Sequence, residues 1–236
     1  MDAPIRLLLH GASGRMGQAL LRLCGEPGST CEVVAAVSRK PAQRVVDGVP
    51  QFAASELHGV PGFDVAIDFS VADAFDPILA VCVERKAAFV SGTTGLDDRQ
   101  RAALADAAGI IPLILASNFS LGVAVLADLV ERAARALPGW DCDIVEAHHA
   151  GKVDAPSGTA LTLGASAGQG GATPRYASLR AGDIVGEHLV QFSGAGERLE
   201  LVHRAGNRDI FARGALHAAS RLAGRNPGNY RLADLL

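Results

Sequence analysis

The first half of the chain alternates short apolar runs with helical patterns, and this alternation constrains the fold more than any other feature. Five short runs bounded by polar, Gly or Pro residues predict β-strands: Ile5–Leu9, Val33–Val37, Val65–Phe69, Ala88–Ser91 and Ile111–Leu115. Three segments between them have apolar residues at helical spacing, Arg15–Leu23, Ala72–Arg85 and Asp97–Ala108, and Asp97 is placed to cap the third. Strict alternation requires right-handed crossovers, so we expect an α/β domain with a Rossmann-like, doubly wound parallel sheet that binds ligands at its carboxyl edge.

A second architecture is expected to begin near residue 119. A helix is predicted over residues 122–137, and after a Pro-Gly turn a strand is predicted over residues 141–149. Two further strands, 188–193 and 198–204, are separated by Gly-Ala-Gly, which predicts an antiparallel hairpin. These elements together predict an α+β domain.

Two other segments complete the predicted organisation. Residues 165–173 read ASAGQGGAT and are too rich in Gly for regular structure, so a flexible surface loop is expected. The last predicted helix, 210–222, and the tail to residue 236 are expected to return to the first domain. The predicted domains are therefore residues 1–118 plus 210–236, and residues 119–209.

The composition excludes several classes of protein. With 49% hydrophobic and 20% charged residues, the chain has ample apolar surface for a globular core. The formal net charge of -3 gives no reason to expect a nucleic acid or an anionic membrane as partner. The N-terminus does not read as a secretory signal, and the four cysteines form no CxxC pair, so buried reduced thiols in a cytoplasmic protein are expected.

A glycine pattern follows the first predicted strand and opens the first predicted helix. Gly11 would permit a tight turn, Gly14 would let backbone N–H groups approach a pyrophosphate, and Gly17 would allow close packing of helix on strand. The GxxGxxG spacing is weak evidence by itself, and a purely structural turn is the alternative. Its place in the first βαβ unit favours a dinucleotide site, while the absence of a Walker pattern argues against a nucleoside triphosphatase.

The residues after the second predicted strand bear on the choice of nucleotide. Ser38 stands where an acidic residue usually binds the ribose hydroxyls, and Arg39 and Lys40 follow it. A 2'-phosphate would fit this basic pair, whereas a solvated basic turn is the alternative reading. We therefore expect NADPH to be preferred, with NADH possible.

The run from Glu146 to Thr159, EAHHAGKVDAPSGT, concentrates chemically active side chains. Along a strand Glu146 and His148 share one face and His149 points the other way, while Lys152 lies in the following loop. The Pro, Ser and Thr residues after it suit a helix N-terminus, which is an anion site. A proton donor, a cation and an anion site together favour hydride addition to a carboxylated substrate.

This run has two alternative readings. A single histidine is more often a core or surface residue, but two histidines with a lysine and a helix start are harder to explain in that way. Metal ligation by Glu146, His148, His149 and Asp154 is the competing chemistry. The spacing matches neither HExxH nor a Cys/His finger, so no metal is expected.

Six motifs resemble those of the dihydrodipicolinate (4-hydroxy-tetrahydrodipicolinate) reductases of lysine and diaminopimelate biosynthesis, over nearly the whole chain. They are GASGRMG near the N-terminus, DFS at 68–70, SGTTG at 91–95, ASNFS at 116–120, EAHHAGKVDAPSGTA at 146–160 and RAGDIVGEH at 180–188. The fifth motif is highly specific. The resemblance implies NAD(P)H-dependent reduction of a small cyclic imine dicarboxylate to tetrahydrodipicolinate, with release of water.

The resemblance also implies residue roles. The pyrophosphate would be held by Gly11, Ala12, Ser13, Gly14, Arg15 and Met16, and the 2'-phosphate by Arg39. The nicotinamide end would be lined by Gly92, Thr93, Thr94, Ala116, Ser117, Asn118 and Phe119. His148 would be the proton donor or acceptor and Lys152 a second proton donor, while the substrate carboxylates would be bound by His149, Gly158 and Thr159.

The second domain is the one through which this family usually forms homotetramers, so it is expected to serve both substrate binding and oligomerisation. The segment 163–178 is shorter than the family resemblance leads us to expect, which leaves the oligomeric state open. An extended short-chain dehydrogenase is the nearest rival, but its YxxxK pair is missing, because Arg180 and Asp234 stand four residues after the two tyrosines. A non-catalytic NADP-binding regulator would have no need of the histidine and lysine run.

Overall fold

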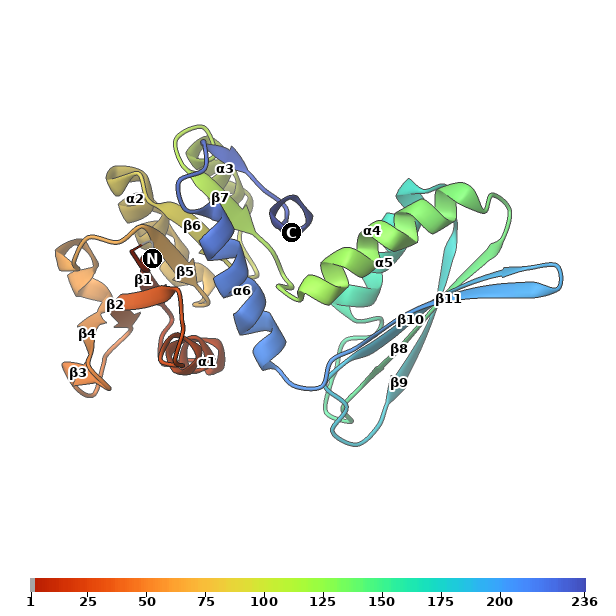
Figure 1. Ribbon diagram of the computed structural model, residues 1–236, viewed down its shortest axis with the longest axis horizontal. Coiled ribbons are helices and arrows are strands. Elements are labelled where there is room, and N and C mark those ends of the chain that lie inside the picture. Colours follow the sequence, from red (N-terminus) through yellow and green to blue (C-terminus); the bar gives the residue numbers. More distant parts are fainter. Residues whose placement is uncertain (1–2) are drawn as a thin grey trace. The chain divides into compact units, whose positions relative to one another are not determined.

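The computed structural model describes residues 3–236. The chain divides into two compact units, Met1–Phe119 with Phe211–Leu236 (unit 1) and Ser120–Ile210 (unit 2). Each unit has its own sheet and its own apolar core (Figure 1). The α/β fold with a second, smaller sheet domain agrees with the expected fold class.

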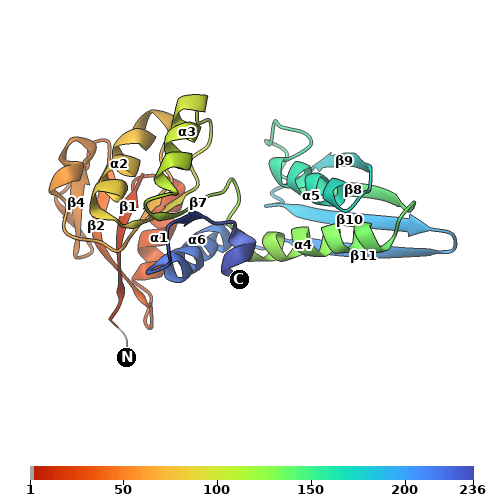
Figure 2. The ribbon, with the colours of Figure 1, turned by 90° about the horizontal axis from the view of Figure 1, so that it is seen from above.

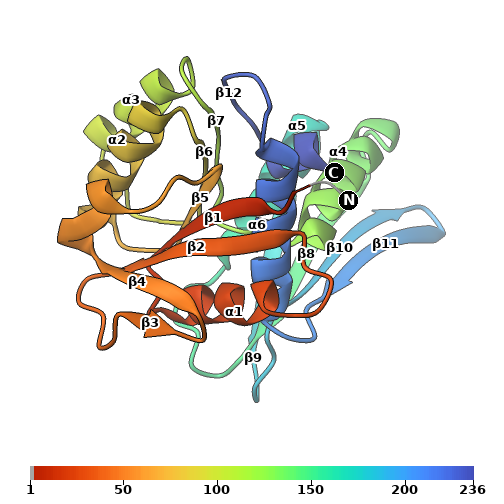
Figure 3. The same cartoon turned by 60° about the vertical axis from the view of Figure 1, so that its left-hand side comes forward.

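Unit 1 is built on one sheet with the strand order β12-β7-β6-β5-β1-β2-β4-β3 (Figure 3). Its strands are β1 (Ile5–His10), β2 (Cys31–Ser38), β3 (Val45–Val46), β4 (Val49–Ala53), β5 (Val65–Asp68), β6 (Ala88–Ser91), β7 (Pro112–Leu115) and β12 (Gly228–Asn229). Every neighbouring pair is parallel except β3 with β4. The expected doubly wound parallel sheet is confirmed, and the short strands β3, β4 and β12 are additions that periodicity did not reveal.

Helices cover both faces of this sheet. They are α1 (Arg15–Cys24), α2 (Phe75–Arg85), α3 (Asp98–Ala107) and α6 (Asp209–Leu222), with short 3-10 turns η1 (Ala54–Gly59), η2 (Ala72–Ala74) and η3 (Leu232–Leu235). Leu8 packs in one core with Ile78 of α2 and Leu104 of α3. Leu7 and Leu9 point to the opposite face, where α1 and α6 lie, and are also buried (Figure 2). This double burial explains why the central residues of these strands are apolar on both faces.

The capping residue predicted for the third helix is confirmed. The Asp97 side chain accepts a hydrogen bond of 2.7 Å from the backbone N–H of Gln100, and the Gln100 side chain accepts one from the Asp97 N–H. This reciprocal capping box satisfies two backbone donors that the first turn leaves without a helical partner.

The C-terminal tail packs on unit 1. Strand β12 pairs with β7, and the Tyr230 N–H donates a hydrogen bond of 2.8 Å to the Leu113 carbonyl. The His217 ring on α6 makes a hydrogen bond of 2.8 Å with the carbonyl of Leu235.

Unit 2 is a four-stranded sheet with two helices on one face (Figure 1). Its elements are α4 (Leu121–Ala136), β8 (Asp141–His148), α5 (Gly158–Gln169), β9 (Pro174–Arg180), β10 (Glu187–Gly194) and β11 (Glu197–Arg204), and the strand order is β11-β10-β8-β9. The antiparallel hairpin of β10 and β11 is confirmed. Strand β9, parallel to β8, was not predicted, because it is a largely exposed edge strand with little apolar periodicity.

The prediction of a flexible loop over residues 165–173 was wrong. Helix α5 continues to Gln169, and only the residues after it form a turn before β9. The small residues that looked like a loop signal are needed for packing, since Ala167 is fully buried between α5 and α4. A Cβ on Gly170 would lie 2.5 Å from the Glu131 carbonyl oxygen of α4. Tertiary packing therefore overrides the weak helix propensity of glycine here.

Two glycines of this segment give a matched test of that explanation. Gly170→Ala should lower the free energy of unfolding by about 1–3 kcal/mol, because the new Cβ meets the backbone of α4. Gly168→Ala, in the last turn of α5 and facing open space, should instead raise it by about 0.5–1 kcal/mol. Urea denaturation followed by circular dichroism measures both, and equal effects would contradict the packing explanation.

Among the described residues, no helix is both long enough and apolar enough to span a membrane.

Candidate active site

The loop after β1 has the geometry that a close approach to a phosphate group requires. Gly11 has a φ of 80°, and a Cβ there would collide with the Phe69 carbonyl. A Cβ on Gly17 would lie 2.5 Å from the Ala12 backbone, so this glycine lets α1 pack directly on the loop. The glycine pattern thus has a steric cause at two of its three positions.

The N-terminus of α1 presents uncompensated backbone donors. Gly14 is its N-cap and supplies no side-chain hydrogen bond, and no acidic residue lies in the first turn. The N–H groups and the positive end of the helix dipole therefore favour an anion at this point. This half of the site fits the pyrophosphate of a dinucleotide.

The basic pair after β2 lies at the same edge of the sheet. Arg39 and Lys40 are exposed, while Ser38 at the end of the strand is buried. No carboxylate occupies the position of Ser38, so nothing there would repel a phosphate on the ribose. Arg39 and Lys40 thus place two exposed positive charges directly after β2.

The residues expected at the nicotinamide end differ in exposure. Thr94 and Ser117 are exposed, whereas Thr93 is buried and its hydroxyl donates a hydrogen bond of 2.7 Å to Asp68. Phe119 is buried and its ring packs edge-on against Phe69 at 5.6 Å between centroids. The side chains of Thr93 and Phe119 thus fix the loops after β6 and β7. At these two positions a ligand would meet the backbone and not the side chain.

In unit 2, Glu146 and His148 share one face of β8, as their spacing predicted, and the structure shows that helices cover this face. The His148 Nδ1 lies 2.5 Å from the Glu146 Oε2, and both side chains are buried. A hydrogen bond between Nδ1–H and the carboxylate leaves Nε2 as the nitrogen available for proton exchange. A Cβ on Gly186 would lie 3.0 Å from that Nε2, so the glycine keeps its surroundings open.

The second hydrogen-bonding partner of Glu146 is Arg180, at the end of β9. Two guanidinium nitrogens of Arg180 donate to the two carboxylate oxygens at 2.9 and 2.8 Å. Burial alone would raise the pKa of Glu146, but hydrogen bonds from Arg180, Ser178 and His148 outweigh it and lower the pKa to about 2. Glu146 is therefore ionised at neutral pH.

Arg180 also fixes the loop that carries Lys152. Its guanidinium donates to the backbone carbonyls of Lys152, at 3.2 Å, and Asp154, at 2.5 Å. The Lys152 ammonium pairs with the Asp154 carboxylate at 2.7 Å, and this contact lowers the pKa of Asp154. One arginine thus couples the position of the lysine loop to that of the Glu146–His148 pair.

The N-terminus of α5 completes this cluster. Ser157 is its N-cap and accepts a hydrogen bond of 3.2 Å from the Ala160 N–H, and its own N–H donates to Glu146. Gly158 and Thr159 form the first turn, and a Cβ on Gly158 would meet open space. Backbone donors at an open helix N-terminus suit a carboxylate. His149 follows β8 directly and is half-buried.

His188 supports this helix start from β10. Its Nε2 lies 3.2 Å from the Ser157 Oγ, and its ring packs edge-on against His148 at 5.2 Å between centroids. Burial, and then the neighbouring His148, lower the pKa of His188 to about 4. The ring is therefore neutral near pH 7.

Sequence reasoning missed the roles of Glu146, Arg180 and His188. The sequence pattern marks Glu146 only as a candidate metal ligand, and the other two stand in the last of the matched motifs without an assigned role. Strand pairing brings them together, because His148 is opposite Arg180 and Glu146 is opposite His188. Across the described part of the chain, no group of three or more His, Cys, Asp or Glu residues has a metal-binding arrangement.

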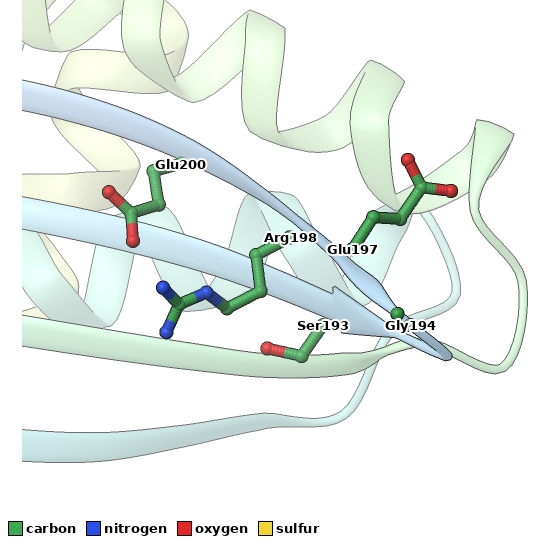
Figure 4. A pocket seen from close by; sticks show the side chains of 6 residues that line it. Ser193, Gly194, Glu197, Arg198 and Glu200 are labelled. Carbon is green, nitrogen blue, oxygen red and sulfur yellow. The ribbon is translucent and has the colours of Figure 1, made fainter.

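An open hollow at the tip of the β10–β11 hairpin lies apart from this cluster (Figure 4). It is lined by Ser193, Gly194, Gly196, Glu197, Arg198 and Glu200. His188 stands at the other end of β10, so the hollow contributes nothing to the candidate site.

Two family profiles match almost the whole chain. The profile described as "Dihydrodipicolinate reductase, N-terminus" matches residues 5–119, and "Dihydrodipicolinate reductase, C-terminus" matches residues 122–236. The chain belongs to the dihydrodipicolinate reductase family. The family resemblance of the sequence motifs is thereby confirmed.

Individual members of this family match the chain over its full length. The chain is 73% identical to the 4-hydroxy-tetrahydrodipicolinate reductase of Stenotrophomonas maltophilia (strain R551-3), over 100% of this chain and 99% of that one. Its identity to the enzyme of the same name from Xylella fastidiosa (strain 9a5c) is 63%, over 100% of both. A solved dihydrodipicolinate reductase from Paenisporosarcina sp. TG-14, with dipicolinate bound, has a TM-score of 0.84 at 23% identity and covers 99% of this chain and 100% of that chain, which supports the fold.

Membership of the dihydrodipicolinate reductase family makes this protein an oxidoreductase that uses a pyridine nucleotide. The expected class of enzyme is therefore confirmed. The two rivals, an extended short-chain dehydrogenase and a non-catalytic NADP-binding regulator, are not favoured.

The lowered pKa of His188 predicts a pH dependence of stability. The unfolded chain, with an ordinary histidine pKa of 6.5, binds a proton at a higher pH than the folded chain does. This stabilising contribution is complete above about pH 6.5 and is lost as the pH falls towards 4, by up to about 3 kcal/mol. The free energy of unfolding, measured by chemical denaturation, should differ less between pH 7 and pH 4.5 in His188→Gln than in the wild type.

His58→Gln is the control for this measurement, because the His58 side chain is 73% exposed. Its pH dependence should match that of the wild type. If His188→Gln loses as much free energy of unfolding between pH 7 and pH 4.5 as the wild type does, His188 is not neutral in the fold.

Proposed function

We propose that this chain reduces 4-hydroxy-tetrahydrodipicolinate to tetrahydrodipicolinate with NADPH, releasing water, in the diaminopimelate and lysine pathway. The observation that carries the proposal is the Glu146–His148 pair, held by Arg180 beside the open N-terminus of α5. A proton donor next to a carboxylate-binding helix start fits a dicarboxylate that gains a hydride and a proton. The names of the relatives at 73% and 63% identity support the choice of substrate.

The proton chemistry is assigned to His148 and Lys152. When bound, the reduced nicotinamide supplies a hydride to the conjugated imine ring, and the ring must then accept a proton. Glu146 holds the His148 Nδ1, so Nε2 is the atom from which His148 donates. The Lys152 ammonium serves as a second proton donor and as a positive charge facing the dianionic substrate.

The substrate carboxylates are assigned to the start of α5. The backbone N–H groups of Gly158 and Thr159 and the His149 ring bind them, and Ser157 keeps the first turn in place. The solved relative from Paenisporosarcina has dipicolinate, itself a dicarboxylate, bound. This supports a dicarboxylate as the ligand of the family.

The cofactor is assigned to unit 1. The loop from Gly11 to Met16 and the N-terminus of α1 hold the pyrophosphate, and Arg39 binds the 2'-phosphate of NADPH, while NADH remains a weaker alternative. The nicotinamide end lies at Gly92–Thr94 and Ala116–Phe119. The uncapped helix start supports the first assignment, and the lack of a carboxylate at Ser38 supports the preference for NADPH.

The sheet of unit 2 supports assembly into a homo-oligomer, with the tetramer as the form that the family resemblance implies. Its helix-free face carries Leu179 and Val202, which are 58% and 43% exposed, on the same side as Leu189. Exposed apolar side chains gathered on one sheet face favour a second protein surface as partner. The four cysteines are free thiols, which supports a reducing, cytoplasmic location.

The decisive test is NADPH oxidation with freshly generated substrate, followed at the nicotinamide absorbance. His148→Gln should lower kcat by roughly 10²-fold or more with a smaller change in KM, as loss of a general acid does. The exposed His58→Gln serves as control and should keep wild-type kinetics. No turnover by the wild type would refute the proposed substrate, and an unchanged kcat in His148→Gln would remove His148 from the chemistry.

The nucleotide preference has its own test in Arg39→Ala. This change should raise the KM for NADPH by roughly tenfold or more and leave that for NADH nearly unchanged, because only NADPH has the 2'-phosphate. Arg44→Ala removes another exposed arginine of unit 1 and should alter neither value. Equal effects of Arg39→Ala on both nucleotides would show that Arg39 does not bind the phosphate.

A further inference from the structure

Three neighbouring strands of unit 1 end in register on buried polar residues. His10 is the last residue of β1, Asp68 of β5 and Ser91 of β6, and the register pairs His10 with Asp68 and Asp68 with Ser91. Their exposed fractions are 5%, 0% and 0%. Residues in register on adjacent strands point to the same face, so the three side chains meet at the carboxyl edge of the sheet.

Asp68 is the centre of this group and accepts four hydrogen bonds. Its Oδ1 lies 2.8 Å from the His10 Nδ1 and accepts from the Ser70 N–H at 3.2 Å. Its Oδ2 accepts from the hydroxyls of Ser91, at 2.9 Å, and Thr93, at 2.7 Å. Burial acts to raise the pKa of Asp68, but the His10 ring and these donors outweigh it and lower the pKa, so the carboxylate is ionised.

The donors belong to the loops that carry the proposed cofactor site. His10 directly precedes the glycine loop, Ser70 follows Phe69, and Thr93 lies between Gly92 and Thr94. Phe69 links the same loops sterically, because a Cβ on Gly11 would strike its carbonyl and one on Gly92 would strike its ring. The Asp68 carboxylate therefore sets the distance between loops from three different strands.

A purely structural role explains this arrangement poorly. A buried carboxylate costs free energy that apolar side chains of similar volume would not, and the other buried residues of the same three strands are apolar. The polar group is confined to the edge where the ligand loops begin. Its donors come from separate loops, which is what fixed positioning of a ligand requires.

We propose that His10 and Asp68 are positioning residues for the pyridine nucleotide, which hold the glycine loop and the Gly92–Thr94 loop in the spacing that binds it. This inference rests on the proposed function, because it takes those loops as the cofactor site. The pair acts through the backbone of the loops and not on the 2'-phosphate. NADPH and NADH should therefore be affected alike, in contrast to the effect of Arg39.

Two substitutions of His10 separate positioning from bulk. In His10→Asn the side-chain amide nitrogen takes the place of Nδ1 and still donates to Asp68. In His10→Leu a side chain of similar size offers no donor, and the buried carboxylate loses a hydrogen bond. Asp68→Asn keeps the shape but places an amide NH2, which is a donor, where the surrounding donors need an acceptor. Ile111→Val is the control, because Ile111 is fully buried in unit 1. It directly precedes β7 and so lies at the amino edge of the sheet, away from the carboxyl edge where His10 and Asp68 meet.

The experiment measures Kd for NADPH and for NADH by nucleotide fluorescence, together with Tm, KM and kcat, on the full chain. We expect His10→Leu and Asp68→Asn to raise both Kd values by roughly tenfold, with kcat at saturating nucleotide changed less. His10→Asn should stay within about twofold of the wild type. Ile111→Val should lower Tm without changing either Kd.

Three results would overturn the proposal. Wild-type Kd values in His10→Leu would show that the pair does not position the loops. If His10→Asn and His10→Leu raise the Kd values equally at equal Tm, nucleotide binding requires the imidazole ring itself and not its hydrogen-bond donor. A rise in Kd for NADPH alone would indicate that the pair contacts the 2'-phosphate. If Asp68→Asn does not fold, the two His10 variants decide the question, whereas a wild type that binds neither nucleotide refutes the proposed function as well.

Discussion

The two hydrogen bonds between Arg180 and Glu146 tie together the parts of unit 2 that matter for chemistry. Glu146 is buried on β8, and such a carboxylate is tolerated only where its charge is balanced and its oxygens are satisfied. The same carboxylate holds the ring of His148, and the same guanidinium holds the backbone of the loop around Lys152. One buried ion pair thus fixes both the His148 ring and the loop that carries Lys152.

Unit 1 repeats this arrangement with different residues. Asp68 is a second buried carboxylate, ionised because donors from several loops surround it. Both carboxylates stand at or near strand ends, where a regular sheet passes into loops that have no backbone ladder to position them. A buried charge with several donors gives such loops one arrangement, since any displacement leaves a polar group unsatisfied.

Much of the fold and part of the site could be predicted from the sequence. The parallel sheet followed from alternation, the Asp97 cap from its spacing, and the shared face of Glu146 and His148 from strand periodicity. The Gly-rich end of α5 was misread, because its helical state depends on contacts with α4 that no local pattern reveals. The partners Arg180 and His188 were unassigned, because they lie more than thirty residues away from Glu146 and reach it by strand pairing.

The sequence by itself determined the fold class and the family, and it singled out the candidate site residues of the fifth motif, because these depend on local periodicity and on motifs that are contiguous in the chain. Only the tertiary structure decided which side chain supports which. In the fold, Glu146 orients the His148 ring, and the hydroxyl of Thr93 donates a hydrogen bond to Asp68. The physical reason is that burial and strand register are properties of the whole fold, and they determine whether a polar group meets solvent, a ligand or another side chain.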